Sequence, residues 1–116
     1  MPIETARTPL TVLTDDERLF KDAVREFAVQ EIAPRVKAME QSGRYDPDLL
    51  PKLFEMGLLG IDIPERFGGT GGTFFQACLA VEELSRVDAA VGVLVDVQNT
   101  LFNNAVHKYG TEEQHR

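Results

Sequence analysis

The chain has 116 residues, of which 43% are hydrophobic and 27% charged, the size and balance of one domain with a single core. That length excludes a two-domain enzyme within this chain. The 19 acidic and 12 basic residues give a net charge of -7, and no cluster of lysine or arginine interrupts the acidic excess. Nucleic acid and anionic membranes are therefore not expected as partners.

The single cysteine and the first residues bear on the compartment. Cys78 cannot form an internal disulfide, and its apolar neighbours Ala77 and Leu79 predict a small core residue rather than a reactive thiol. No apolar stretch approaches the roughly 20 residues that span a bilayer. Residues 1–13 contain one base, Arg7, and no apolar block, so we expect a flexible N-terminal segment without a secretion or transit signal. The expected location is cytoplasmic, or the mitochondrial matrix in a eukaryote.

A first helix is predicted to begin after Thr14, because Thr14 and Glu17 have the spacing of a capping box. Apolar residues follow at helical spacing over 20–32 and predict one buried face. Pro34 predicts a kink or a local break, after which the apolar row continues until Gly43.

A short second helix is predicted next, with two possible starts. Pro47 favours Asp46 as the N-cap, whereas Pro51 is easier to place in the first turn when the cap is Asp48. Gly57 can adopt the left-handed conformation that ends a helix. Residues 61–64 then predict an extended buried segment, and the glycine run 68–72 predicts a loop.

A third helix is predicted after Thr73, which forms a second capping box with Gln76, and its largely apolar sequence places it centrally. A fourth helix should run from Asp88 to Tyr109. A third capping box, Thr111 with Gln114, starts a helix that has scarcely one turn in this chain. With no strand-period alternation, residues 14–116 are expected to form an all-α domain of about four main helices plus the start of a fifth.

Three clusters contain residue types that can carry chemistry. The glycine run 68–72 could cradle a phosphate, but it lacks the lysine of a P-loop, and ordinary turn formation is the competing interpretation. Glu82 and Glu83 could act as acid and base, or form an ion pair with Arg86. His107 and His115 have no partner at a metal-ligand spacing, so no metal site is predicted.

The fourth helix carries more information than these clusters. One predicted apolar face contains Val91, Leu94, Val95, Leu101, Phe102 and Ala105. Gln98 falls in the middle of that face, so it requires a buried partner. The opposite, polar row contains Asp96, Asn99, Thr100, Asn103 and His107. The helix is therefore either a core helix with one satisfied glutamine or a helix that lines a ligand cavity.

Three segments, GLLGIDIPERFGGTGG, EELSRVDAAVGVLVDVQNTL and KYGTEEQ, occur in an order that resembles the N-terminal helical domain of acyl-CoA dehydrogenases, closest to the short/branched-chain type. The resemblance runs from about Leu13 to the last residue. It implies a three-domain flavoenzyme in which a carboxylate removes the α proton of an acyl-CoA while FAD accepts the β hydride, giving the trans-2-enoyl product. The base and most FAD contacts of the family lie in other domains, so no catalytic, cofactor-binding or metal-binding residue is assigned here.

The resemblance also implies that the fourth helix lines the far end of the acyl pocket. The matching residues are Leu94, Val97, Gln98 and Leu101. Because Leu94 and Val97 are bulky, a short or branched acyl group is the expected substrate class, and this chain alone is expected to be inactive.

Partners are implied in the same way. Family members that use electron-transferring flavoprotein receive it on an apolar patch of this domain, and the matching positions Leu58, Thr70, Gly72 and Ala80 are less apolar here. The complete enzyme is expected to be a homo-oligomer, a tetramer. The alternative is a free-standing helical interaction module without enzymatic activity.

Overall fold

The computed structural model describes residues 9–116. The flexible segment expected over 1–13 falls mostly outside the described residues, and its last part makes a turn in which the amide of Val12 donates to the carbonyl of Pro9. Within residues 9–116 there are helices and turns but no strand, which confirms the all-α class. The elements are α1 Asp15–Phe27, η1 Ala28–Ile32, η2 Ala33–Arg35, α2 Val36–Ser42, α3 Leu49–Glu55, η3 Glu65–Phe67, α4 Phe74–Val87, α5 Ala89–Asp96, η4 Val97–Asn103 and α6 Asn104–Tyr109.

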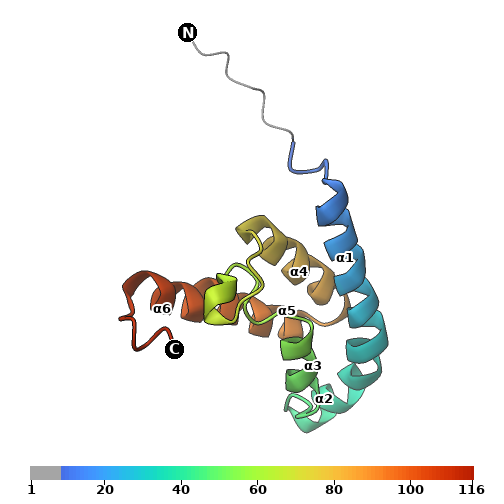
Figure 1. The fold of residues 1–116 in the computed structure, drawn as a ribbon. Helices are drawn as coiled ribbons and strands as arrows, with labels where there is room; N and C mark the ends of the chain where they lie inside the picture. The colour runs from blue at the N-terminus through green and yellow to red at the C-terminus, as the bar shows by residue number, and fades with distance from the viewer. Residues whose placement is uncertain (1–8) are drawn as a thin grey trace.

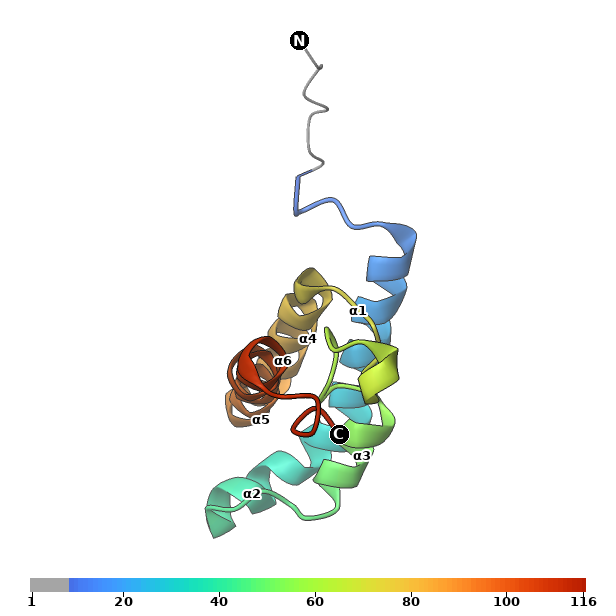
Figure 2. The ribbon, with the colours of Figure 1, turned by 60° about the vertical axis from the view of Figure 1, so that its left-hand side comes forward.

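Apart from the short turn η3, these elements form four helical rods, because several follow one another without an intervening loop, although a rod can be bent (Figure 1). The first rod is α1–η1–η2–α2, the second α3, the third α4, and the fourth α5–η4–α6. In Figure 2, α4 and the fourth rod lie on one side of the molecule, and α1 and α3 on the other. The predicted fifth helix is only a turn, although the amide of Thr111 does donate to Gln114 Oε1 at 2.9 Å.

The boundaries of the first rod follow from its capping groups and its proline. The Thr14 amide donates to Glu17 Oε1 at 2.9 Å, and the Glu17 amide donates to Thr14 Oγ1 at 3.2 Å, as predicted. Ahead of and around Pro34 the regular α pattern gives way to the π-helical turn η1 and the 3-10 turn η2. The predicted local break is therefore present, and the rod ends at Gly43 with φ +67°.

Two expectations in the middle of the chain are resolved by the structure. Asp48 is the residue that precedes α3, but its side chain makes no capping hydrogen bond. The side-chain bond at the start of this helix comes from Asp46, whose Oδ1 accepts from the Asp48 amide at 2.9 Å. The extended segment predicted over 61–64 is wrong for most of its length, since residues 61 and 62 form a turn and residue 63 a bend, while Pro64 alone has extended backbone angles. Ile61 is nevertheless fully buried, because the turn directs its side chain into the core.

The core lies where α4 packs against both α1 and α5, so the third helix is central as predicted. α4 and α5 approach closely because Gly92 has no side chain, and a Cβ there would collide with Oγ of Ser85. The buried apolar residues that form this core are Val24, Phe27, Ala28, Ile32, Met39, Leu49, Leu53, Leu58, Leu59, Ile61, Ala77, Ala80, Leu84, Val91 and Val95.

A buried carboxylate joins α1 to α4. Glu83 is 1% exposed, and its Oε2 accepts a hydrogen bond from Arg25 Nε at 3.0 Å. Lys21 Nζ lies 3.6 Å and Arg86 Nε 3.9 Å from Glu83 Oε1. Glu82 is exposed and Glu83 is buried, so the two neighbouring glutamates do not form an acid–base pair. The predicted ion pair with Arg86 is present, and the contact of Glu83 with Arg25 is the shorter one.

The prediction that Cys78 is a core residue is wrong, because its side chain is exposed. On α4 the buried face passes through Ala77, Ala80 and Leu84, at i, i+3 and i+7. Adjacent helical residues point in directions about 100° apart. The apolar neighbours of Cys78 in the sequence therefore say little about the direction of Cys78 itself.

Candidate functional site

The fourth rod presents two different stripes of residues, each with a spacing of four. Val91, Val95 and Asn99 are 0%, 0% and 1% exposed, and the half-buried Asn103 continues their line. We call these four residues the anchored stripe. Because they face the core and the turn at residues 58–61, they fix the rod to the rest of the domain.

The second stripe faces away from the domain. Val93, Val97 and Leu101 are 58%, 43% and 63% exposed, and Ala105 continues their line. We call these four residues the exposed stripe. A continuous apolar row of this kind on a helix marks a surface made to contact another apolar surface or ligand.

The π-helical segment η4 explains why residues four apart stay in line along both stripes of the fourth rod. An α-helix has 3.6 residues per turn, so residues four apart drift around it, whereas a π-helix closes i→i+5 hydrogen bonds and has a wider turn. Over Val97–Asn103 the rod is π-helical, which counteracts the drift along both stripes. Isolated π segments inside α-helices are frequently found at functional sites.

The apolar face predicted for this helix is therefore partly wrong. Val91 and Val95 are buried as expected, but Leu101 and Phe102 are 63% and 61% exposed. The buried polar residue is Asn99, from the row that was expected to be wetter, and not Gln98. The prediction assumed an uninterrupted 3.6-residue period, and η4 changes the register halfway along the rod.

Sequence reasoning did not single out Asn99, although its amide makes three hydrogen bonds. Its Nδ2 donates to the carbonyls of Leu58 and Val95 at 2.8 Å each, and its Oδ1 accepts from the amide of Ile61 at 2.8 Å. Asn103 adds a bond from its Nδ2 to the carbonyl of Leu59 at 2.7 Å. The sequence does contain a sign of their burial, since Asn99 and Asn103 follow the buried Val95 by four and eight residues.

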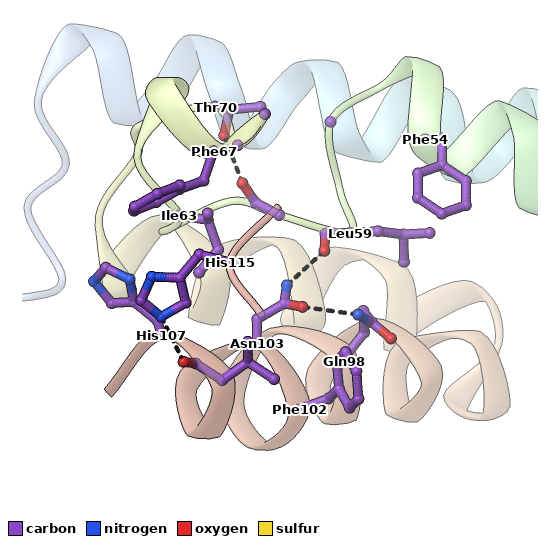
Figure 3. Close-up of a pocket in the computed structure, with 15 residues that line it drawn as sticks. Phe54, Leu59, Ile63, Phe67, Thr70, Gln98, Phe102, Asn103, His107 and His115 are labelled. Atoms are coloured by element: carbon purple, nitrogen blue, oxygen red, sulfur yellow. Dashed lines mark hydrogen bonds between the residues drawn. The ribbon is translucent and has the colours of Figure 1, made fainter. Parts of the chain in front are cut away.

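A cavity of about 270 Å³ lies between the fourth rod and the loop that precedes α4 (Figure 3). Gln98 and Asn103 form part of its wall, and Gln98 Nε2 donates to Asn103 Oδ1 at 2.8 Å. At the other end the rings of His107 and His115 lie 6.0 Å apart, with Phe67 against both. His115 Nε2 lies 2.8 Å from the carbonyl oxygen of Val106, which brings the end of the chain against the fourth rod.

The four predicted acyl-pocket residues lie in three different environments. Val97 and Leu101 belong to the exposed stripe. Leu94 is half-buried against the core, and Gln98 lines the 270 Å³ cavity. The described residues therefore do not bring all four into one cavity, and only the exposed stripe groups two of them.

The glycine run does not have the free amides that a phosphate cradle needs. The backbone N–H groups of residues 68–72 donate to the chain's own carbonyls, those of Glu65, Pro64, Gly60, Ile63 and Ile61 in that order. Gly69 is required there, because a Cβ would collide with the carbonyl of Ile63. The loop is a self-bonded turn, so its amides do not fit the role of a pyrophosphate cradle.

Two of the positions matched to a partner-docking patch are not on the surface. Leu58 and Ala80 are both fully buried in the core, while Thr70 is exposed and Gly72 is half-buried. Among residues 9–116 no group of three His, Cys, Asp or Glu side chains could hold a metal ion. Over the same residues, no helix is long and apolar enough to cross a membrane.

An ion-pair network joins the first rod to α3. Glu31 Oε2 lies 3.3 Å from Lys52 Nζ and 3.2 Å from Arg35 Nη1, while Arg35 Nε lies 3.1 Å from Asp46 Oδ2. The hydrogen bond from Lys52, supported by the charges of Lys52 and Arg35, outweighs desolvation and lowers the pKa of Glu31 below its usual value. These ion pairs join η1, η2 and α3 to the loop that precedes α3.

The fold and the site define an all-α domain of four rods, one of which carries an exposed apolar stripe. Residues 14–116 match the family described as the N-terminal domain of acyl-CoA dehydrogenases, and the chain belongs to this family. Over 106 residues it is 45% identical to the short/branched chain specific acyl-CoA dehydrogenase of Bos taurus mitochondria, covering 91% of this chain and 24% of that protein.

Solved structures agree with this assignment. Butyryl-CoA dehydrogenase of Megasphaera elsdenii superposes with a TM-score of 0.81 at 33% identity, covering 90% of this chain and 28% of that one. A chain in a structure of the electron transferring flavoprotein of Acidaminococcus fermentans superposes with a TM-score of 0.84 at 38% identity, covering 90% and 27%. The chain thus spans about a quarter of the length of these relatives.

Proposed function

We propose that this chain is the N-terminal domain of an FAD-dependent acyl-CoA dehydrogenase that oxidises a short or branched acyl-CoA to the trans-2-enoyl-CoA. Family membership supports the class of enzyme, and the 45% identity to a short/branched-chain relative supports the substrate class. In this proposal FAD accepts the β hydride after the α proton is removed. We place the flavin contacts mainly on other parts of the enzyme, which agrees with a glycine loop that has no free amides for a pyrophosphate.

The exposed stripe carries the proposal. Val93, Val97 and Leu101 present branched apolar side chains on one side of the fourth rod, outside the domain's own core. Such a wall can bind methyl and methylene groups of an acyl chain, and its bulk limits how long that chain can be. The chain's contribution to the reaction is therefore to bind and orient the acyl group and to exclude water from it.

The first prediction tests this wall in the enzyme that carries this domain. Val97→Ala should raise kcat/KM for longer acyl-CoA substrates relative to the shortest, because removing two methyl groups opens space for substrate methylenes. Each methylene accommodated is worth about 1 to 3 kcal/mol of selectivity. Alanine keeps the helix intact, and the measurement is the ratio of kcat/KM values across a series of chain lengths.

Matched variants separate the effect of the exposed stripe on chain-length selectivity from effects of side-chain removal elsewhere and of lost stability. Val29→Ala removes the same two methyl groups from a residue that is 56% exposed on η1, away from the stripe, and should leave the ratio unchanged. Leu94→Ala should mainly lower stability, since Leu94 packs on the core. Gln98→Leu should leave the ratio unchanged. Identical chain-length profiles for Val97→Ala, Leu101→Ala and the parent would contradict the assignment.

Partners and assembly form part of the same proposal. We propose electron-transferring flavoprotein as the electron acceptor and a homotetramer as the assembly, by analogy with the family, with the acyl-CoA as substrate. Because Leu58 and Ala80 are buried, a docking patch on this domain would have to use other residues, such as Thr70 at the surface. We propose a cytoplasmic location for a bacterial enzyme and the mitochondrial matrix for a eukaryotic one.

A second candidate function is a free-standing interaction module. The observation that favours it is the cavity of about 270 Å³ flanked by two aromatic side chains, Phe54 and Phe102, which are 68% and 61% exposed. The measurement that separates the two is acyl-CoA oxidation by the product of the complete reading frame. Flavin-dependent oxidation of acyl-CoA by that product supports the enzyme. A product of about 116 residues that does not oxidise acyl-CoA supports the interaction module.

A further inference from the structure

We propose that Asn99 is a positioning residue, which fixes the direction of the exposed stripe by holding the π-helical segment η4 against the turn at residues 58–61. This inference rests on the proposed function, since it concerns how the acyl wall is oriented. Asn99 does not touch the proposed acyl group. It acts through Val97 and Leu101, which lie two residues before and two residues after it on the opposite side of the rod.

Side chains stabilise the π register of η4. In a π-helix the backbone N–H groups bond to carbonyls five residues earlier rather than four. Side chains in and beside η4 donate to carbonyls four residues earlier instead: Asn99 to Val95 at 2.8 Å, Thr100 to Asp96 at 2.9 Å and Asn104 to Thr100 at 3.1 Å. These bonds give the carbonyls additional partners while the π turn is maintained.

Of Asn99, Thr100 and Asn104, only Asn99 also makes hydrogen bonds outside the rod. Its amide group joins the Leu58 carbonyl to the Ile61 amide, forty residues earlier in the chain, and it is buried with a 1% exposed fraction. Neighbouring Asn103 bonds the carbonyl of Leu59, as Figure 3 shows. The rod is therefore attached to one turn through two asparagines, one helical turn apart.

Asn99 and Asn103 attach the anchored stripe to the turn at residues 58–61, so the opposite, exposed stripe can rotate about the rod axis only if these attachments break. If η4 reverted to an α-helix, the register of Leu101 and Ala105 relative to Val93 would change, because the number of residues per turn would change. The wall would then no longer present its side chains in one row.

The test uses the complete enzyme and two variants of graded severity. Asn99→Asp keeps the oxygen that accepts from the Ile61 amide but loses the donor to the carbonyls of Leu58 and Val95. Asn103→Asp loses the donor to the Leu59 carbonyl but can still accept from Gln98. The matched control is Asn104→Asp, which makes the same chemical change on the same rod. Asn104 bonds only to Thr100 within the rod and not to the turn.

The expected result is a change of about tenfold or more in the ratio of kcat/KM values between short and longer acyl-CoA substrates for Asn99→Asp and Asn103→Asp, the scale of one methylene. Asn104→Asp should leave the ratio within about twofold of the parent. Methyl NMR signals of Val97 and Leu101 should shift in the first two variants and not in the control. A purely structural asparagine would lower the melting temperature without moving the ratio.

The outcomes distinguish this inference from the function on which it rests. If Val97→Ala changes the chain-length ratio but neither asparagine variant does, the positioning role is wrong and the acyl wall stands. If none of the three changes it, the acyl wall itself is wrong. Should Asn99→Asp fail to fold, Asn103→Asp decides, and an unchanged ratio in that variant overturns the proposal.

Discussion

Glu83 is surrounded by three cationic side chains that contribute unequally. Only Arg25 donates a hydrogen bond to it, at 3.0 Å, whereas Arg86 lies 3.9 Å away with a half-exposed side chain. Arg25→Ala would leave a buried carboxylate without its donor, so we expect a loss of about 1.5 to 3 kcal/mol of unfolding free energy. Arg86→Ala should cost less than about 1 kcal/mol. Urea unfolding of both variants measures the difference, and equal losses would disprove the ranking.

Whether an individual side chain is buried was the property least predictable from the sequence. Cys78 and Glu83 lie on the same helix, and whether each faces the core depends on the rotation of α4, not on residue type. A glutamate is normally exposed, and Glu83 is buried because α1 places Arg25 and Lys21 beside it, about sixty residues earlier in the chain. Asn99 was missed for the same reason, since its partners Leu58 and Ile61 are distant in sequence.

Among elements, Glu31 joins the first rod to α3 through its ion pair with Lys52, at 3.3 Å. Because its pKa is lowered in the folded state, the carboxylate stabilises the fold above its unfolded pKa, and this contribution is lost as the pH falls through the folded pKa. Glu31→Gln should therefore be less stable than the parent at neutral pH, and the difference should vanish below the usual range of a glutamate.

Thermal melts from neutral to acid pH measure that dependence. The matched control is Glu26→Gln on the same rod, where the carboxylate accepts a hydrogen bond from the exposed Gln30. That variant should follow the parent's pH curve closely. A constant difference between Glu31→Gln and the parent at all pH values would show that the charge of Glu31 contributes nothing.

Element boundaries were largely predictable, because their causes are local. The capping boxes of Thr14 and Thr73, the Asp88 cap and the break at Pro34 all depend on residues within a few positions of each other. The π-helical η4 was not predictable by the same means. It is stabilised by carbonyls of a turn about forty residues earlier, and a periodicity analysis that assumes 3.6 residues per turn cannot detect it.

For the whole molecule, we expect concentration-dependent association of the 116-residue chain. Several large apolar side chains are exposed, among them Phe54, Leu101 and Phe102 at 68%, 63% and 61%. The net charge of -7 opposes association, and salt screens that repulsion, so added salt should increase it. Sedimentation velocity at several protein and salt concentrations measures the effect.

A variant with Leu101→Gln and Phe102→Gln provides the control for association. It removes apolar area from the fourth rod without touching the anchored stripe, so its sedimentation coefficient should depend less on concentration. A parent chain that sediments as a monomer at every concentration, with a melting temperature independent of concentration, would show that these exposed side chains do not drive association.

The loop before α4 has a consequence for how this domain can change over evolutionary time. Its turns are closed by backbone amides and carbonyls between residues 60 and 72, and not by the side chains of Glu65 and Arg66. The guanidinium of Arg66 lies over the ring of Phe67, 4.7 Å from its centroid. Mutations at Glu65 and Arg66 can alter the charge near the cavity rim while the shape of the loop is retained. Substitutions at these two exposed positions should therefore change the chemistry of one surface at little cost in folding.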